Sequence, residues 1–544
     1  MFGGDIGWTP DGASIFFVTG QRTEQRRVAM LDLKPRMPEF REEAFRKLFE
    51  KPVAPEKKAA PKTEFVKDGL RDRLRLLPLG MDASEPAISP DGRTLVFVAT
   101  IAGQDSLYSF SLDRDARERP TPRQVTSTPA PKSSPTWSAD GKSLTYLEAG
   151  RIVSIDLAAR APRPVTVTGE LIERFEETKM AVFRQAWMRM RDSFYDPQYH
   201  GADWTGEVKR LYGEAVAGSR TSDEMRRVLN LMVGELNASH LGVSGPLGGP
   251  PAAVFGRLGL DWEEANGALR VTAVLARGPA ALAGGVAVGD VLAAVNGTAI
   301  SGPVNLDSLL ERQTGKEVTL TLGSGKTVRL RPISIPAEKS LRYETWVEER
   351  RALVSKYSSG RLGYVHMIDM GDSSLEKLSF DLDAETHGKD GVVVDVRNNN
   401  GGYVNAYALD ILARRNYLTM QPRGLEPGPA RAALGQRTIE KPTVLVTNQH
   451  SLSDAEDFTE GYRALGLGKV VGEPTAGWII FTSSTPLLDG SVIRVPSVRI
   501  TTAKGENMEL HPRPVDVPVT RPMGESYQGT DIQLQTAVKT LLGQ

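Results

Sequence analysis

The stretch 443–456, TVLVTNQHSLSDAE, decides the fold of the C-terminal part of the chain. It opens with an uninterrupted apolar run, which is typical of a strand buried on both faces. Ser453 then stands where a helix is expected to begin. Similar apolar runs at 362–367 and 391–396 alternate with helical stretches. This alternation predicts an α/β unit over residues 338–544.

Three short segments of this unit fall at predicted strand ends, where sites form in α/β folds. Residues 395–402, DVRNNNGG, place a Gly-Gly turn where backbone N–H groups can approach a ligand oxygen. Residues 448–456 place Ser453 near a helix N-terminus, which favours an anion. Glu509 follows further along the chain. Taken singly, each has an ordinary explanation: a helix cap, a plain turn and a surface carboxylate.

Three segments near the N-terminus resemble one another, at residues 8–18, 89–98 and 137–147. Each places Asp-Gly in a tight turn between two strand-like runs, a strong hairpin signal. Repetition at blade-like spacing predicts a β-propeller, with three hairpins of a sandwich as the simpler alternative. Three copies are too few to close a ring. Residues 1–167 are therefore expected to be a partial propeller, with a solvated Pro-, Lys- and Ala-rich loop at 51–67, in a chain that could be the C-terminal part of something longer.

The segment after the repeats is helical in pattern. Apolar side chains recur at helical intervals through residues 170–236, and Asp196-Pro197 interrupts the first run. This predicts a small helical domain over residues 168–248, which carries Ser239 and His240 near its end.

Residues 249–337 contain a strand, a short Ala-rich helix, a Gly-Asp turn and an Asn-Gly hairpin, in that order. This order resembles a PDZ domain, a fold that holds a peptide C-terminus by strand addition and captures its carboxylate on loop N–H groups. The resemblance implies that Leu258, Gly259 and Leu260 form the cradle for the carboxylate. A PDZ domain kept only as a spacer is the alternative.

Residues 472–478, GEPTAGW, lie where one class of serine peptidases carries Gly-x-x-Thr-x-Gly-Lys. In that class the lysine takes the proton from the serine, but the position here is Trp478, whose indole cannot act as a base. The motifs and the order of the units nevertheless resemble the tricorn-type members of serine peptidase family S41, which also includes the tail-specific proteases. The chain is accordingly expected to be a multidomain α+β protein with a partial β-propeller, a small helical domain, a PDZ domain and an α/β S41 catalytic domain.

The resemblance implies a catalytic tetrad of Ser453, His240, Ser239 and Glu509. Ser453 would be the nucleophile and His240 its general base, with Ser239 or Glu509 holding the imidazole in the productive tautomer. The base then comes from the helical domain, some two hundred residues before the nucleophile.

The same resemblance implies an oxyanion hole made of the backbone N–H groups of Gly401 (or Gly402) and Asp454. Trp478 is expected to form a wall of the substrate cleft. Neither a metal nor another cofactor is expected, because no His pair at helical spacing accompanies a carboxylate.

Neighbouring residues compete for two of these roles. Ser453 is preferred over Ser451 because the family pattern places a glutamate three residues after the nucleophile, and Glu456 fits only Ser453. His450 lies three residues before Ser453 and is the rival to His240 as base.

Two glutamates compete for the acidic position of the expected tetrad. The family's glutamate lies seven residues before an aspartate, which selects Glu509 and Asp516 over Glu506. The proline that usually precedes this aspartate is Val515 here, so Glu506 stays an alternative. His366 lies in a predicted strand and is expected to be a core residue.

Composition limits the partners and the compartment. Acidic and basic residues number 67 each, so no global field favours nucleic acid or an anionic membrane. There is no cysteine, no apolar run of the ~18 residues that a membrane span needs, and no visible signal peptide. The resemblance implies a soluble, cytoplasmic homo-oligomer, with six copies in tricorn-type proteins. A periplasmic location would follow if the chain is a fragment of a longer precursor.

The function implied by the resemblance is that of a serine endopeptidase or oligopeptidase. It would hydrolyse unfolded polypeptides or oligopeptides through an acyl-enzyme. Two alternatives stay open: a non-catalytic peptide-binding scaffold that uses the PDZ domain and the propeller, and a tail-specific-type protease with a different base.

Overall fold

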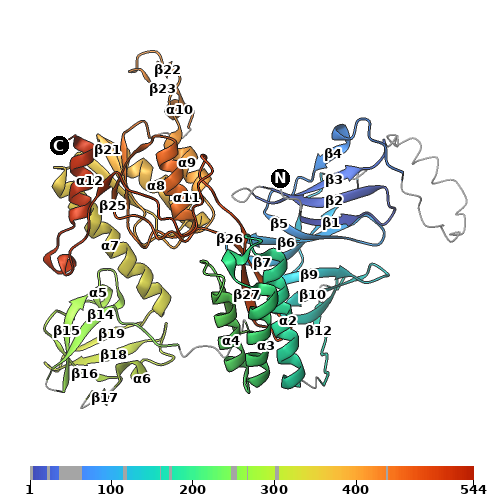
Figure 1. The fold of residues 1–544 in the computed structure, drawn as a ribbon, viewed down its shortest axis with the longest axis horizontal. Coiled ribbons are helices and arrows are strands. Elements are labelled where there is room, and N and C mark those ends of the chain that lie inside the picture. The colour runs from blue at the N-terminus through green and yellow to red at the C-terminus, as the bar shows by residue number, and fades with distance from the viewer. Residues whose placement is uncertain are drawn as a thin grey trace, which may run out of the picture. The chain divides into compact units, whose positions relative to one another are not determined.

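The computed structural model describes residues 4–543, apart from 21–24, 36–63, 114–118, 160, 171–173, 247–253, 266, 301–304 and 436–438. Most of the loop predicted at 51–67 therefore lies outside the described residues. The chain divides into two compact units, Met1–Ile172 and Glu173–Gln544, which are treated separately below (Figure 1).

The first unit consists, in its described part, of three antiparallel sheets of four strands each, with a short 3-10 turn at Arg71–Arg73. Each sheet follows the chain in simple order, as a propeller blade does. The strands are β1 (Gly4–Trp8), β2 (Ser14–Thr19), β3 (Arg27–Asp32) and β4 (Leu74–Leu76); β5 (Ala83–Ile88), β6 (Thr94–Ile101), β7 (Gln104–Ser111) and β8 (Arg123–Gln124); β9 (Lys132–Trp137), β10 (Ser143–Glu148), β11 (Arg151–Asp156) and β12 (Ala161–Pro164).

The first hairpin of every sheet has the same turn. Asp11, Asp91 and Asp140 each accept a hydrogen bond from a hydroxyl two residues earlier and from the backbone N–H two residues later. The glycine after each aspartate has a φ between 63° and 74°, which a residue with a side chain rarely adopts. The repeated turn and the repeated sheet confirm the prediction of a partial propeller-like fold.

The second unit begins with the helical domain, α2 (Phe175–Ser193), α3 (Lys209–Gly218) and α4 (Ser222–Gly234), with short turns at Tyr199–Gly201 and Trp204–Val208. The helix α2 ends just before Asp196-Pro197, as the proline requires. Thr221 caps α4, because its hydroxyl accepts a hydrogen bond from the Glu224 N–H at 3.2 Å.

The PDZ domain follows as a mainly antiparallel sheet with two short helices and a hydrophobic core of its own. Its Asn-Gly turn joins two of the strands, as predicted. The elements are β14 (Leu260–Ala265), β15 (Ala268–Val274), α5 (Pro279–Ala283), β16 (Val291–Val295), β17 (Thr298–Ala299), α6 (Leu306–Leu309), β18 (Val318–Leu322) and β19 (Thr327–Leu330).

The α/β domain is built on a parallel sheet whose described strands run in the order β20 (Leu362–His366), β21 (Gly391–Asp395), β24 (Thr443–Thr447), β25 (Gly468–Gly472) and β28 (Val517–Pro518). The three apolar runs predicted as strands are its first three members. The helices α8 (Asp372–Thr386), α9 (Asn405–Ala413) and α11 (Asp454–Ala464) pack on one face, and α7 (Ile335–Tyr357) and α12 (Ile532–Leu542) on the other. Smaller elements are β22 (Thr419–Met420), β23 (Gly428–Pro429), α10 (Ala430–Ala433) and the turn Glu525–Gln528.

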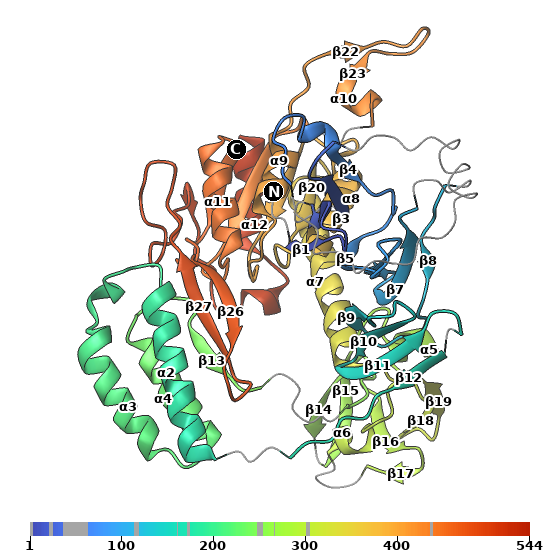
Figure 2. The ribbon, with the colours of Figure 1, turned by 90° about the vertical axis from the view of Figure 1, so that its right-hand side faces the viewer.

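A hairpin of β26 (Phe481–Pro486) and β27 (Val492–Val498), called the bridging hairpin here, leaves the α/β domain and joins the helical domain. Its strand β27 pairs with β13 (Gly242–Ser244), which follows His240. Ile493 and Val495 of the hairpin belong to the same hydrophobic core as α2 and α4 (Figure 2). Two segments about 250 residues apart in the sequence therefore form one sheet and one core.

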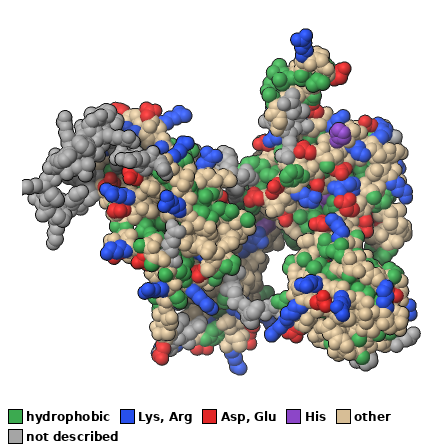
Figure 3. Space-filling view, turned by 180° about the vertical axis from the view of Figure 1, so that it is seen from behind, with side chains coloured by type: hydrophobic (Ala, Val, Ile, Leu, Met, Phe, Trp, Pro, Cys, Tyr) green, Lys and Arg blue, Asp and Glu red, His purple; other side chains and the backbone are tan. Residues whose placement is uncertain are grey.

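Charged side chains are spread over the surface. On the face shown in Figure 3, acidic and basic groups alternate, and neither sign forms a large continuous area. Within the described residues, no helix is both long and apolar enough to span a membrane.

Candidate active site

Ser453 lies at a sharp turn between β24 and α11. Its φ of 54° and ψ of −122° form a combination that a residue with a side chain rarely adopts. The strand β24 before Ser453 and the helix α11 after it maintain this strained backbone conformation. Such a turn projects the serine hydroxyl away from the sheet, as a nucleophile elbow does.

A chain of hydrogen bonds leads from the Ser453 hydroxyl to a buried carboxylate. The His240 Nε2 lies 3.1 Å from Ser453 Oγ, and the His240 Nδ1 lies 2.7 Å from Ser239 Oγ. Ser239 donates its hydroxyl proton to Glu509 Oε2 at 3.0 Å. The four residues of the expected tetrad, from three separate parts of the sequence, therefore lie along one chain of hydrogen bonds.

Glu509 is held by more than this one contact. Its Oε1 accepts the Ser239 backbone N–H at 2.6 Å, and its Oε2 also accepts the Ile479 N–H at 2.8 Å. The side chain is 1% exposed, so the carboxylate depends on these donors for stabilisation. Glu509 thus fixes Ser239, and Ser239 in turn fixes the imidazole.

The bridging hairpin determines where His240 lies. His240 has a φ of 60° at the turn between α4 and β13, and β13 is paired to β27 immediately afterwards. The imidazole therefore reaches Ser453 from the helical domain, while its backbone is tied to a strand of the α/β domain. Docking between these two domains is a condition for the contact.

Electrostatics keeps this imidazole neutral. Burial, together with the positive charge of Arg494, lowers the pKa of His240 to about 4. A neutral ring has one N–H, and donation from Nδ1 to Ser239 leaves Nε2 as an acceptor facing Ser453. His240 can then accept the Ser453 proton at neutral pH.

The Gly-Gly turn lies against the nucleophile. A Cβ on Gly401 would come within 2.6 Å of Ser453 Cβ, and a Cβ on Gly402 within 2.1 Å of the Met370 carbonyl oxygen. Only glycine lets the backbone come this close. Asp454, the first residue of α11, has its backbone N 3.1 Å from the same point beside Gly401.

Hydrogen bonds within the turn distinguish the two glycines. The Gly401 N–H already donates to Asn399 Oδ1 at 2.9 Å, whereas Asn399 itself donates from Nδ2 to the Met367 carbonyl at 2.8 Å. Asn399 is fully buried and braces the turn from inside. Of the two predicted donors, this geometry favours Gly402.

Glu456 organises the segment that ends in Trp478. Its carboxylate accepts hydrogen bonds from the Thr475 hydroxyl at 2.6 Å and from the Gly477 and Trp478 N–H groups at 2.7 Å. Burial raises the pKa of Glu456 despite these donors. The backbone at 478 is thus fixed close to α11, while the indole is 53% exposed.

The predicted cradle at 258–260 is part of the PDZ domain. Leu258 and Leu260 are buried, and the carbonyls of Leu258 and Gly259 accept N–H groups next to α5. The loop lines a cavity of about 260 Å³ that Arg257 and Arg342 also border.

The rejected neighbours have other contacts. Ser451 is buried and donates to the Val396 carbonyl at 2.8 Å, and the side chain of His450 is exposed. His366 is buried between Tyr343 and the Arg397 carbonyl, as expected for a core residue. Glu506 is exposed.

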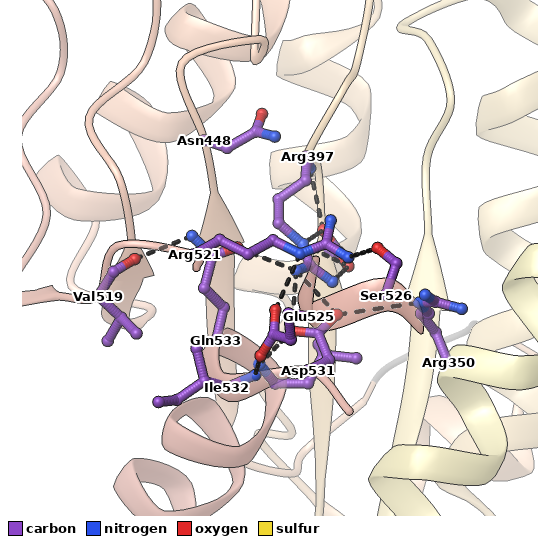
Figure 4. Close-up of polar contacts among 12 residues, drawn as sticks. Arg350, Arg397, Asn448, Val519, Arg521, Glu525, Ser526, Asp531, Ile532 and Gln533 are labelled. Atoms are coloured by element: carbon purple, nitrogen blue, oxygen red, sulfur yellow. Dashed lines mark hydrogen bonds and ion pairs between the residues drawn. The ribbon is translucent and has the colours of Figure 1, made fainter. Parts of the chain in front are cut away.

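A buried ion network supports the strand before the Gly-Gly turn. Arg397 contacts Asp395 at 2.7 Å and Asp531, the cap of α12, at 3.0 Å, and its Nη1 donates to Gln533. Figure 4 shows the Arg397 guanidinium directed at this end of α12. Burial by itself would raise the pKa of Asp395, but the charges of Arg397 and His366 and the hydrogen bonds from Arg397 together outweigh burial, and the pKa is lowered. The network joins the turn to the C-terminal helix.

Known protein families match the domains described above. The profile of peptidase family S41 matches residues 361–519, the Tricorn protease C1 domain matches 175–234, and a PDZ domain matches 270–322. "Tricorn protease homolog 1" of Streptomyces coelicolor is 34% identical over 406 residues, which cover 72% of this chain and 37% of the relative. The chain belongs to the tricorn protease homologues of peptidase family S41.

Two more distant tricorn proteins agree with this assignment. "Tricorn protease" of Thermoplasma volcanium is 26% identical over 70% of this chain and 37% of its own length. The solved "Crystal structure of the tricorn protease" has the same fold, with a TM-score of 0.77 and 19% identity over 99% of this chain and 55% of that one. The present homologue thus spans little more than a third of the curated relatives named here.

Several residues of this tricorn homologue's site were not anticipated from sequence. Arg494 and the Asp395–Arg397 pair are ordinary polar residues in strands and turns, and no spacing rule marks them. A sequence signal existed for Asn399, because it lies two residues before Gly401, a distance typical of side chains that bond a nearby backbone N–H. Among the described residues, no group of three or more His, Asp or Glu side chains could hold a metal ion.

Proposed function

We propose that this chain is a serine endopeptidase or oligopeptidase that hydrolyses unfolded polypeptides or oligopeptides. The observation that carries the proposal is the 3.1 Å contact between His240 Nε2 and Ser453 Oγ, continued through Ser239 to buried Glu509. This is the geometry of a nucleophile with a base and an orienting pair behind it.

In the proposed mechanism, His240 Nε2 takes the proton of Ser453 Oγ as the oxygen attacks a peptide carbonyl carbon. The oxyanion is bound by the N–H groups of Gly402 and Asp454. His240 then gives its proton to the leaving amine, and the acyl-enzyme forms. Water, deprotonated by the same Nε2, releases the second product and restores Ser453.

Two further roles belong to this proposal. The exposed indole of Trp478 would form a wall of the substrate cleft, because its backbone is fixed beside α11. The loop at 258–260 would bind a substrate's C-terminal carboxylate, as PDZ loops do.

We also propose that the domains span residues 1–167, 168–248, 249–337 and 338–544. We further propose that the chain self-associates, and light scattering of the purified protein would test the self-association.

The two alternatives make different predictions about Ser453. A non-catalytic scaffold has no need of an activated serine, and a tail-specific-type enzyme would need another base. In the described part of the chain, Ser453 Oγ contacts His240 and no lysine. This favours the histidine-dependent enzyme.

A fluorophosphonate probe tests the proposal directly, because it reacts with activated serines. The probe should label the native chain but not Ser453→Ala, and His240→Ala should slow labelling by orders of magnitude. His450→Ala is the matched control and should label at the native rate. A native chain that is folded but unlabelled would show the scaffold to be correct, and undiminished labelling of His240→Ala would show that another base operates.

A further inference from the structure

Arg494 lies beside the proposed base, yet the mechanism gives it no task. It is in the middle strand of the sheet β13–β27–β26, opposite Gly242 on one side and Ser484 on the other. Gly242 follows His240 by two residues. Its positive charge contributes, after burial, to the lowered pKa of His240.

The side chain of Arg494 faces away from the core of the helical domain. Successive residues of a strand point to opposite faces, and its neighbours Ile493 and Val495 are both buried in that core. Arg494 is therefore on the other face of the sheet, where it is exposed to solvent.

No protein group neutralises this arginine. Among the described residues, Arg494 has no ion pair and no hydrogen bond from its guanidinium, although many of the other arginines have one or both. The carboxylate of the proposed site, Glu509, is occupied by Ser239 and Ile479. Partial burial lowers the pKa of Arg494, and no anion offsets the effect. The guanidinium therefore keeps its N–H donors free for an anion from outside the protein.

The position of His240 indicates which part of a substrate would come near. The base must protonate the leaving amine, so it lies on the side of the residues that follow the scissile bond. We propose that Arg494 binds a substrate carboxylate on this side, and that it thereby determines specificity for peptides with an anionic group just after the cleaved bond. This inference rests on the proposed peptidase function.

A carboxylate there can have two sources, an acidic side chain or the C-terminus of the peptide itself. A guanidinium binds both through the same paired N–H···O contacts. Arg494 would therefore make the same contacts with either carboxylate, and only changes to the peptide can distinguish the acidic side chain from the C-terminus.

The experiment compares four versions of one peptide whose cleavage site has first been mapped by mass spectrometry. They carry Glu or Gln directly after the cleaved bond and end in a free carboxylate or an amide. The full chain and Arg494→Gln, Arg494→Lys and Arg329→Gln variants are assayed, each normalised by fluorophosphonate titration of Ser453. Arg329 is an exposed arginine of the PDZ domain and serves as the control for loss of one charge.

The native chain should cleave the carboxylate peptides roughly 10- to 100-fold better in kcat/KM than the neutral one. Arg494→Gln should abolish that preference, Arg494→Lys should restore part of it, and Arg329→Gln should keep it. Loss of the preference on amidation assigns the C-terminal carboxylate, and loss on Glu to Gln assigns the side chain.

Equal loss on all four peptides in Arg494→Gln, or a native enzyme that does not distinguish them, would overturn the inference. A native chain that is not labelled at Ser453 would instead overturn the proposed function. The two failures are therefore separable.

Discussion

The helical domain and the PDZ domain are attached to the α/β domain in different ways. The helical domain shares a hydrophobic core and a sheet with the bridging hairpin. Among the described residues, the core of the PDZ domain is formed by that domain alone, and ion pairs such as Arg342–Asp261 and Arg277–Glu344 link it to α7. Shared cores cost several kcal/mol to separate, whereas exposed ion pairs contribute about 0–1 kcal/mol. The domain that delivers His240 is thus built in, and the PDZ domain is attached at its surface.

Removal of the imidazole should have the largest effect. His240→Ala is expected to lower kcat by about 10⁴-fold or more, because Ser453 then has no base. The variant should fold normally, as the side chain is not part of the core. Steady-state kinetics with circular dichroism would check both points, and activity within tenfold of the native chain would contradict the role of the helical domain.

Equivalent cavity-forming substitutions in the cores of the helical domain and the PDZ domain test whether the two domains differ in their attachment. Ile493→Ala and Leu320→Ala each remove a fully buried aliphatic group and should each cost about 2–5 kcal/mol of local stability. Only Ile493→Ala should also lower kcat, because only its core positions His240. Denaturant unfolding and kinetics of both variants give the answer, and an equal loss of kcat in both would show that the two domains are coupled alike.

The pH profile should reflect the environment of His240. A pKa of about 4 leaves the imidazole neutral, so kcat/KM should stay level from pH 7 to about pH 5 and fall below pH 4. A histidine with an ordinary pKa of about 6.5 would already lose roughly 30-fold at pH 5. Rates measured over pH 3.5–8, with folding monitored in parallel, distinguish these cases.

The surface link to the PDZ domain should matter least. Arg342→Gln removes a bidentate contact to Asp261 and a second contact to Glu338. The expected loss is below about 1 kcal/mol, with kcat on short peptides unchanged. A large fall in kcat would mean that the PDZ domain helps to place the catalytic groups.

The sequence was sufficient where local rules apply. Alternating strands and helices predicted the α/β domain, and Asp-Gly turns predicted the blades. The family pattern, with Glu456 three residues after Ser453, selected that serine over Ser451. These signals are short-range, since each depends on residues close together in the chain.

What the sequence did not reveal depends on long-range packing. Ile493 and Val495 have the pattern of any half-buried strand, and nothing local shows that their core belongs to another domain. Arg494 is equally typical of an exposed strand position, and its lack of a partner is visible only in three dimensions. The choice between Gly401 and Gly402 likewise required the hydrogen bond from Gly401 to Asn399.

The long separations in the site have a consequence for synthesis of the protein. Ser239 lies 270 residues before Glu509, and α12, which anchors Arg397, follows later still. A ribosome completes the helical domain long before it makes the carboxylate or the bridging hairpin. The unfinished polypeptide therefore has a serine-histidine pair with nothing to act on and no nucleophile turn in place. If the proposed function holds, hydrolytic capacity should arise only once the chain through α12 has emerged and folded.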